Sequence, residues 1–195
     1  MIEEILKLDS KLFLYLNNLG TPEFDSFWTT LSKIEANILM YLFLIFLFFY
    51  IQKIRPKFLY IFYIFFVIAL MITITDQGAN FFKDSFQRLR PCHNESLTHS
   101  LRLVKENCGG KYGFFSAHAS NSFSLAIFFG LLFKNTIRYI IVITIVYASL
   151  ISYSRIYLGV HYPIDIIVGS SFGISVGLIM YGFVYLKFLK FFDKT

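Results

Sequence analysis

Basic and histidine residues occur in three clusters beside long apolar segments of this chain. The clusters are residues 83–91 (KDSFQRLRP), 115–120 (FSAHAS) and 154–165 (SRIYLGVHYPID). They supply cations that can hold the oxygens of a phosphate, and histidines that can attack phosphorus or move a proton. Charge near a bilayer is costly, so its concentration beside apolar segments indicates chemistry.

The third cluster gives the sharpest prediction. His161 and Asp165 are four residues apart and can share a face, with Pro163 well placed as the first residue of a helix. The carboxylate would hold one imidazole nitrogen protonated and leave the other free to attack phosphorus. Arg155 adds a cation, and Gly159 lets the backbone turn. A His–Asp pair that only closes a loop is the alternative, but it does not explain the arginine or the other clusters.

The first cluster supplies two cations that suit a phosphoryl group. Lys83 and Arg90 are seven residues apart, close to two helical turns, so they share a face if the helix runs to Pro91. An ammonium and a forked guanidinium on one face can bind several phosphate oxygens. Snorkelling of both side chains into lipid headgroups is the alternative. Asp76, seven residues before Lys83, is expected to brace a basic side chain or to bond to a neighbouring helix.

The second cluster lies where an apolar segment begins. Ser116 is a predicted helix N-cap, which leaves the first amides of the helix, including that of Ala117, unpaired at its positive end. Such an end binds anions, and His118 in the first turn would face the anion and donate a proton to a leaving oxygen. A capping serine beside an interfacial histidine is also a common structural arrangement.

The elements that must position these residues are membrane-spanning helices. The chain has 195 residues, 56% of them hydrophobic and only 15% charged, with a mean hydropathy of +0.62. Residues 58–75 and 166–186 carry no charge and are each about long enough to cross a bilayer. We therefore predict an all-α, polytopic membrane helical bundle that forms a single domain over residues 1–195. The five predicted spans are residues 27–51, 58–82, 117–133, 138–158 and 164–187.

Residues 1–20 precede the first span and contain a predicted amphipathic helix. Its apolar stripe is formed by Ile5, Leu8, Leu12, Leu16 and Leu19. This pattern is typical of a helix that lies in the membrane interface, and packing against the spanning helices as ordinary core is an equal alternative.

A stripe of small residues marks the last predicted span. Gly169, Gly173 and Gly177 follow one another at four-residue spacing. Small residues on one face let a neighbouring helix approach closely, so we expect tight packing within the chain. Glycines that only reduce the bulk facing lipid are the alternative.

The short connections predict the orientation of the chain. Residues 53–57, 134–138 and 187–195 hold eight Lys or Arg and one acid, so we expect them to be cytoplasmic. This topology brings all three clusters, and the loop at 84–115, to the periplasmic face of a bacterial inner membrane. Basic residues at helix ends, without a continuous patch, argue against a nucleic-acid partner.

Two cysteines lie in the outer loop. A disulfide between Cys92 and Cys108 is reasonable in an oxidising compartment, and two free thiols are the alternative. A zinc site that adds His93 and His99 would have no familiar spacing.

Together, the pattern Lys-x6-Arg-Pro, Ser-x-His and Ser-Arg-x5-His-x3-Asp resembles the type-2 phosphatidic acid phosphatase family of membrane lipid phosphatases. The resemblance covers roughly residues 58–187. It implies that His161 is a nucleophile forming a phosphohistidine, that Asp165 orients it and that His118 is the general acid. It also implies a phosphate that is held without metal or cofactor by Lys83, Arg90, Ser116 and Arg155. The Ala117 amide, at the predicted helix N-terminus, is a further predicted phosphate ligand.

The second motif departs from the family pattern. The family usually reads Pro-Ser-Gly-His, whereas Phe115 and Ala117 stand here in place of the proline and the glycine. Ala117 still offers a backbone amide to an anion. The departure therefore bears on substrate identity more than on catalysis.

These observations predict a metal-independent phosphatase that acts on a membrane lipid phosphate or diphosphate. Undecaprenyl diphosphate ranks first as substrate, and phosphatidylglycerophosphate, phosphatidic acid and lipid A phosphates are alternatives; the order follows family analogy. A non-hydrolytic lipid-phosphate carrier that uses the same anion site is the alternative of another class. The sequence does not set the oligomeric state.

Overall fold

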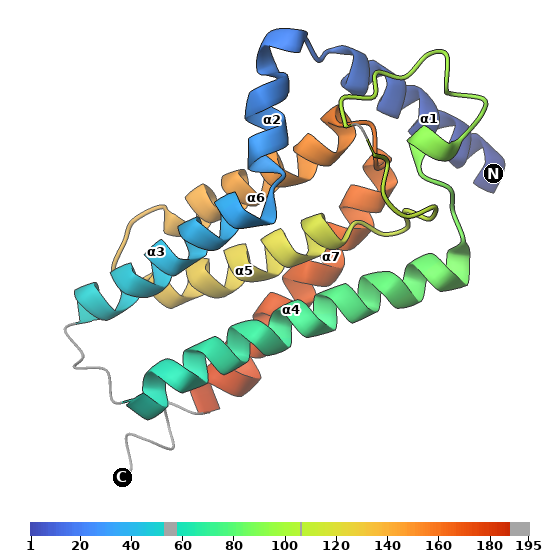
Figure 1. Ribbon diagram of the computed structural model, residues 1–195. Helices are drawn as coiled ribbons and strands as arrows, with labels where there is room; N and C mark the ends of the chain where they lie inside the picture. Colours follow the sequence, from blue (N-terminus) through green and yellow to red (C-terminus); the bar gives the residue numbers. More distant parts are fainter. Residues whose placement is uncertain (53–57, 106, 188–195) are drawn as a thin grey trace.

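The structure, a computed structural model, describes residues 1–52, 58–105 and 107–187, and most of these residues are helical (Figure 1). Apolar helices run side by side, and the N-terminal helix lies across one end of them. The elements in chain order are α1 (Ile2–Asn18), η1 (Pro22–Phe24), α2 (Asp25–Leu31), α3 (Ile34–Gln52), α4 (Phe58–Phe86), η2 (Pro91–His93), α5 (Ala117–Phe133), α6 (Ile140–Tyr157), α7 (Pro163–Ile179) and the π-helical η3 (Met180–Tyr185).

The apolar helices confirm a multi-pass membrane protein. Three stretches are long and apolar enough to cross a bilayer, namely Ile61–Phe86, Ile140–Tyr157 and Pro163–Gly182. Shorter apolar helices cover Asn37–Tyr50 and Ala117–Phe133. Each of these five stretches overlaps one of the five predicted spans, although Ile61–Phe86 runs four residues past the predicted end at residue 82.

The first predicted span, residues 27–51, is broken in the structure. α2 ends at Leu31 and α3 begins at Ile34, and the two helices point in different directions (Figure 1). The Asn37 side chain donates hydrogen bonds to the backbone oxygens of Leu31 and Lys33, at 3.0 and 2.7 Å, which satisfies the end of α2. A single continuous helix is therefore wrong here, and the break leaves Ser32 buried at the end of the bundle.

Helix α5 forms the centre of the bundle and packs most closely against α7. A Cβ atom at Gly169 would lie 2.6 Å from the backbone oxygen of Ser116, just before α5, and one at Gly177 would lie 2.6 Å from that of Ser124. One at Gly173 would overlap the backbone oxygen of Ser120. The close packing predicted from the glycine stripe is thus confirmed. This contact places the start of α7 beside the start of α5.

A phenylalanine-rich core fills the interior away from α1. Phe128, Phe129 and Phe133 of α5 are buried there against α3, where Phe48 meets Phe133 edge to face at 5.8 Å between ring centroids. Such contacts hold the helices together by dispersion and shape, without polar groups.

Helix α1 has two faces of opposite character. Ile5, Leu8 and Leu12 of the predicted stripe are exposed, at 48%, 65% and 47% of their surface. The buried face consists instead of Asp9, Phe13 and Asn17. Most of the stripe therefore faces away from the protein, as expected for an interfacial helix, while Leu16 and the buried face pack on the bundle.

Asn17 fastens α1 to the end of α6. Its amide nitrogen donates to the backbone oxygens of Ile156, Tyr157 and Arg102, each at 3.0 Å, and its oxygen accepts from the Arg102 amide at 2.7 Å. A fully buried amide that makes these contacts fixes the position of the helix strongly.

Helix α4 ends before Pro91, so it does not reach the point that a shared helical face of Lys83 and Arg90 requires. It stops at Phe86, and Gln87 takes a positive φ of 47° that ends the helical path. Lys83 and Arg90 therefore do not share the face of one helix. The chain turns after Gln87 and carries Arg90 back over the end of the bundle.

The returning chain forms a small, cross-linked cap. Backbone hydrogen bonds of 2.8 and 3.1 Å join residues 88–90 to residues 111–113. A disulfide links Cys92 and Cys108, whose Cα atoms are 6.1 Å apart. Two remote stretches of the loop are thereby held beside α7.

One of the three basic connections that predict the orientation lies wholly within the described residues. The connection between α5 and α6, which contains Lys134 and Arg138, lies at the end of the bundle opposite α1 (Figure 1). Residues 53–57 and 188–195, on which the predicted orientation also rests, lie outside the described residues.

Candidate active site

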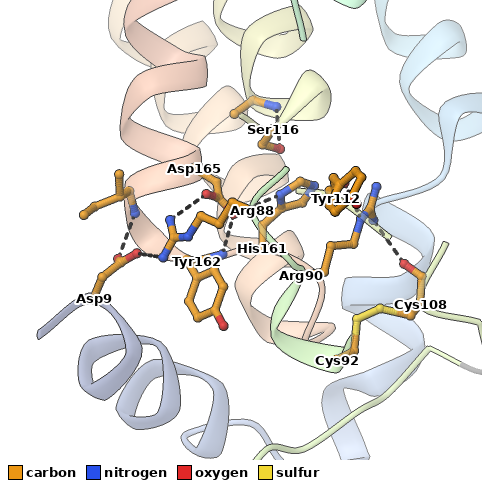
Figure 2. A network of polar contacts seen from close by, with 12 residues as sticks. Asp9, Arg88, Arg90, Cys92, Cys108, Tyr112, Ser116, His161, Tyr162 and Asp165 are labelled. Atoms are coloured by element: carbon orange, nitrogen blue, oxygen red, sulfur yellow. Dashed lines mark hydrogen bonds and ion pairs between the residues drawn. A yellow bond between two sulfur atoms is a disulfide. The ribbon is translucent and has the colours of Figure 1, made fainter. Parts of the chain in front are cut away.

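His161 and Asp165 lie next to each other at the junction of α6 and α7, as their spacing predicts (Figure 2). α7 begins at Pro163, and the Asp165 Oδ2 atom faces His161 Nδ1 at 3.4 Å. Gly159, with φ at 82°, makes the turn before the histidine. The two side chains are 3% and 0% exposed. With Nδ1 turned to the carboxylate, Nε2 is the nitrogen that can attack phosphorus.

Both oxygens of the Asp165 carboxylate accept hydrogen bonds. Oδ2 accepts from the Tyr162 amide at 3.0 Å, and Oδ1 accepts from Arg88 Nη1 at 2.8 Å (Figure 2). The backbone oxygen of Asp165 accepts from the Ser116 amide at 3.1 Å. The second and third sequence clusters are therefore joined directly.

The loop between α4 and α5 holds the Arg90 guanidinium by backbone contacts. Arg90 donates to the Tyr112 oxygen through Nε at 3.2 Å and to the Cys108 oxygen through Nη1 at 3.0 Å (Figure 2). Gly113 makes this approach possible, because a Cβ atom there would lie 3.0 Å from Arg90 Cγ and 3.4 Å from Asp165 Oδ2. The guanidinium is thereby held near the His161–Asp165 pair.

Arg155 lies in the last turn of α6 and is 4% exposed. Its Nη1 atom donates to Ser32 Oγ at the break between α2 and α3. Its Nε atom is buried and has no hydrogen-bond partner among the described residues. An unsatisfied guanidinium donor at this point is suited to an anion that the site would bind.

Electrostatics keep His161 neutral. Burial lowers the pKa of His161 well below its ordinary value, and the positive charges of Arg155, Arg90 and Lys83 lower it further. The predicted phosphate ligands thus act on the imidazole together, although Lys83 and Arg90 come from different elements. A neutral imidazole can act as a nucleophile at neutral pH.

The start of α5 provides the other side of the site. Ser116 is the N-cap, as predicted, and its Oγ accepts from the Ala119 amide at 3.4 Å. Ala117 and His118 follow in the first turn and line a cavity of about 430 Å³. The cavity is also bordered by aliphatic side chains of α3 and α4, among them Ile34, Ile38 and Ile72, which are 63%, 50% and 36% exposed.

A polar pair, Asp76 and Asn121, lines the same cavity. Asn121, one turn beyond His118, donates to Asp76 Oδ1 at 2.9 Å and accepts from Thr75. The prediction that Asp76 bonds to a neighbouring helix is thus confirmed. The pair also gives this largely apolar cavity a carboxylate, in the lining to which His118 belongs.

Sequence reasoning missed several residues that build this site. Arg88 lies inside the first cluster, but its partners are 77 and 79 positions away. Asp9 and Ser32 lie in segments whose patterns indicate only helices, and no local signal points to their contacts with Arg88 and Arg155. Every predicted phosphate ligand and both histidines nevertheless lie around this end of the bundle; their roles in a reaction stay predictions.

A helical membrane protein with a buried, neutral histidine, an orienting carboxylate and several converging cations is built for phosphoryl chemistry. A family model described as the PAP2 superfamily matches residues 66–189. The chain belongs to this superfamily and is a membrane phosphatase of lipid phosphates.

Two similar proteins are named lipid A 4'-phosphatase. The one from Porphyromonas gingivalis is 36% identical over 189 residues, which cover 96% of this chain and 76% of the relative. The one from Bacteroides thetaiotaomicron is 33% identical over 183 residues, which cover 93% and 79%.

Two solved structures are similar as well. The crystal structure of Aquifex aeolicus LpxE has a TM-score of 0.64 at 28% identity, covering 87% of this chain and 92% of that protein. A PAP2-type phosphatidylglycerolphosphate phosphatase from Bacillus subtilis has a TM-score of 0.68, covering 92% and 86%; at 17% identity it supports the fold alone.

Proposed function

We propose that this protein removes a phosphate from lipid A at the periplasmic face of a bacterial inner membrane. The observation that carries the proposal is the similarity to two lipid A 4'-phosphatases along nearly the whole chain. It supports the lipid A alternative over undecaprenyl diphosphate, which family analogy placed first.

The cavity beside His118 supports the same choice of substrate. The group that leaves with the ester oxygen would lie next to His118, the predicted acid, and hence near Asp76 and Asn121. A carboxylate there would repel the second phosphate of a diphosphate. Hydroxyl and amide groups of an acylated sugar can instead donate hydrogen bonds to it. The exposed aliphatic side chains at the rim suit acyl chains that remain in the bilayer.

The proposed reaction proceeds in two steps through a phosphohistidine. His161 Nε2 attacks phosphorus, the bond from phosphorus to the ester oxygen breaks, and His118 gives that oxygen a proton. His118 then takes a proton from water, which attacks phosphorus and breaks the nitrogen–phosphorus bond to release phosphate. The phosphate oxygens would be bound during both steps by Lys83, Arg90, Ser116, the Ala117 amide and Arg155.

The proposed orientation rests on charge and on the cross-linked loop. Basic residues without acids mark the α5–α6 connection, at the end opposite the candidate site. The disulfide lies at the site end and suits an oxidising compartment. A thiol label that cannot cross membranes should reach Cys92 and Cys108 from outside after reduction; labelling only from the cytoplasmic side would invert the orientation.

Phosphate release from purified protein tests the function. We expect release from lipid A that exceeds release from undecaprenyl diphosphate, phosphatidylglycerophosphate and phosphatidic acid, and that persists with EDTA. His161→Ala should abolish release, whereas His99→Ala, at an exposed histidine of the loop between α4 and α5, should not. Preference for undecaprenyl diphosphate would contradict the substrate, and loss with EDTA would contradict the metal-free mechanism. A lipid carrier would keep its transport activity in His161→Ala.

A further inference from the structure

Arg88 connects the candidate nucleophile to the N-terminal helix. Its Nη1 atom donates to Asp165 Oδ1 at 2.8 Å, and its Nη2 atom donates to Asp9 Oδ2 at 2.6 Å (Figure 2). The guanidinium carbon also lies 4.0 Å from the centroid of the Tyr162 ring. A planar group held by two carboxylates and an aromatic ring has little freedom to move.

Asp9 is unusual for a residue of an interfacial helix, because it carries a carboxylate whose side chain is only 1% exposed. Its Oδ1 atom accepts from the Ile164 amide at 3.0 Å, in the first turn of α7. The carboxylate therefore contacts both Arg88 and the start of the helix that carries Asp165. A negative charge at a helix N-terminus stabilises that end.

The charges of this network bear on His161. If Arg88 paired with Asp165 alone, the guanidinium would neutralise the carboxylate that faces the imidazole. Two carboxylates share the guanidinium here, so Asp9, Arg88 and Asp165 together carry one net negative charge when both carboxylates are ionised. That charge can stabilise the positive imidazole ring of a phosphohistidine. The fixed Oδ1 contact also directs Oδ2 toward His161 Nδ1.

We propose that Arg88 and Asp9 are positioning residues for the reaction at His161, and that helix α1 is thereby part of the catalytic apparatus. Arg88 fixes the orientation of the Asp165 carboxylate, and Asp9 preserves its negative charge toward the imidazole. Neither residue touches the substrate. This inference rests on the proposed function of His161 as nucleophile.

Steady-state kinetics on lipid A separate this role from substrate binding. We expect Arg88→Gln to lower kcat about 100-fold and Asp9→Asn about 10-fold, each with KM within about threefold of the wild type. The double variant should be no slower than Arg88→Gln alone, because Asp9 acts through Arg88. Arg102→Gln is the matched control, since it breaks another Arg–Asp pair of 2.6 Å at this end of the protein, and its kcat should stay within about twofold.

A second readout does not require turnover. Diethyl pyrocarbonate modifies neutral histidines, so its rate at His161 as a function of pH, followed by mass spectrometry, reports the pKa of that residue. Asp9→Asn removes a negative charge and should lower the pKa, whereas Arg88→Gln removes a positive charge and should raise it. Arg88→Lys should keep the wild-type profile more closely than Arg88→Gln does.

Several outcomes would overturn the proposal. A purely structural tether would lower thermal stability in both variants and leave kcat and the labelling profile of His161 unchanged. Shifts of the profile in the same direction, or additive losses in the double variant, would contradict the charge argument. If wild-type protein released no phosphate from lipid A, the proposed function would fail, and the labelling profiles would still test the positioning role.

Discussion

The two halves of the candidate site differ in how completely their polar groups are bonded. In the half around His161, the Asp165 carboxylate is fully buried and both of its oxygens are occupied. In the half around His118, the side chains border a cavity of about 430 Å³. Arg155 Nε, which has no partner within the described parts of the chain, also has bonding capacity left.

The difference corresponds to what each half must do. A nucleophile and its orienting groups perform the same step for any substrate, so they can be fixed in advance by bonds within the protein. The half that meets the phosphate and the leaving group must keep donors and space for a ligand. The closed half is therefore expected to control rate, and the open half to control both rate and choice of substrate.

Removing each histidine should break this comparison most clearly. His161→Ala should lower kcat by at least about 10⁴-fold for every lipid phosphate, because it removes the nitrogen that we propose attacks phosphorus. His118→Ala should lower kcat about 10²–10⁴-fold, and the loss should be larger the more the leaving oxygen needs a proton. Phosphate release from lipid A and from a phosphate ester with a more acidic leaving alcohol measures both.

The acidic leaving group is the internal control. It needs little protonation, so it should restore much of the activity of His118→Ala and none of that of His161→Ala. Equal rescue of both variants would mean that the two histidines do not have the separate roles proposed for them.

Asp76→Asn should sharpen the comparison on the open side. The substitution keeps size but removes the charge that we place beside the leaving group. We expect kcat/KM for lipid A to fall about 10-fold relative to that for undecaprenyl diphosphate, as for loss of a hydrogen bond to a charged group. The ratio is measured with both lipids in one reaction, and an unchanged ratio would contradict the role given to Asp76 in substrate choice.

The sequence predicted the local parts of this site well and the remote parts poorly. His161 with Asp165, the Ser116 cap and the glycine stripe of α7 depend on helical spacing, which can be read over a few residues. The contact of Ser32 with Arg155, at the break after α2, and the path of Arg90 depend instead on hydrogen bonds made to other segments. Those contacts change where a helix ends, and composition does not reveal them.

Asp9 and Arg88 illustrate the same limit. Each is a single charged residue in a segment with another evident explanation, an amphipathic helix for one and a phosphate-binding cluster for the other. Asp9 and Arg88 are 79 residues apart in the sequence, and their contact forms only because α1 packs across the end of the bundle. Composition could therefore identify the membrane class, while the positioning contacts required the fold.

The disulfide offers a smaller change that acts on the open half through Arg90. Cys92→Ser with Cys108→Ser removes the link beside the Cys108 oxygen, to which Arg90 donates. We expect KM for lipid A to rise about threefold with little change in kcat, and unfolding to become easier by about 3 kcal/mol, as for a loop of this length. Kinetics and thermal denaturation measure the two effects, and a large loss of kcat would contradict the assignment of Arg90 to phosphate binding.

The smallest expected effect concerns the pH profile of the wild type. Burial and the charges of Arg155, Arg90 and Lys83 lower the pKa of His161, so the neutral imidazole persists below the ordinary value of about 6.5. An unperturbed histidine would be half protonated at pH 6.5 and would halve kcat/KM, so we expect a loss of less than twofold there, with the acid limb at lower pH. The substrate phosphate titrates in the same pH range, so the acid limb must be assigned to one of the two groups, and Arg90→Gln does this. If the limb belongs to His161, loss of the Arg90 charge should move it to higher pH. If the limb belongs to the substrate phosphate, its position should not change. An acid limb at or above pH 6.5 in the wild type would mean that the closed half does not hold its nucleophile neutral.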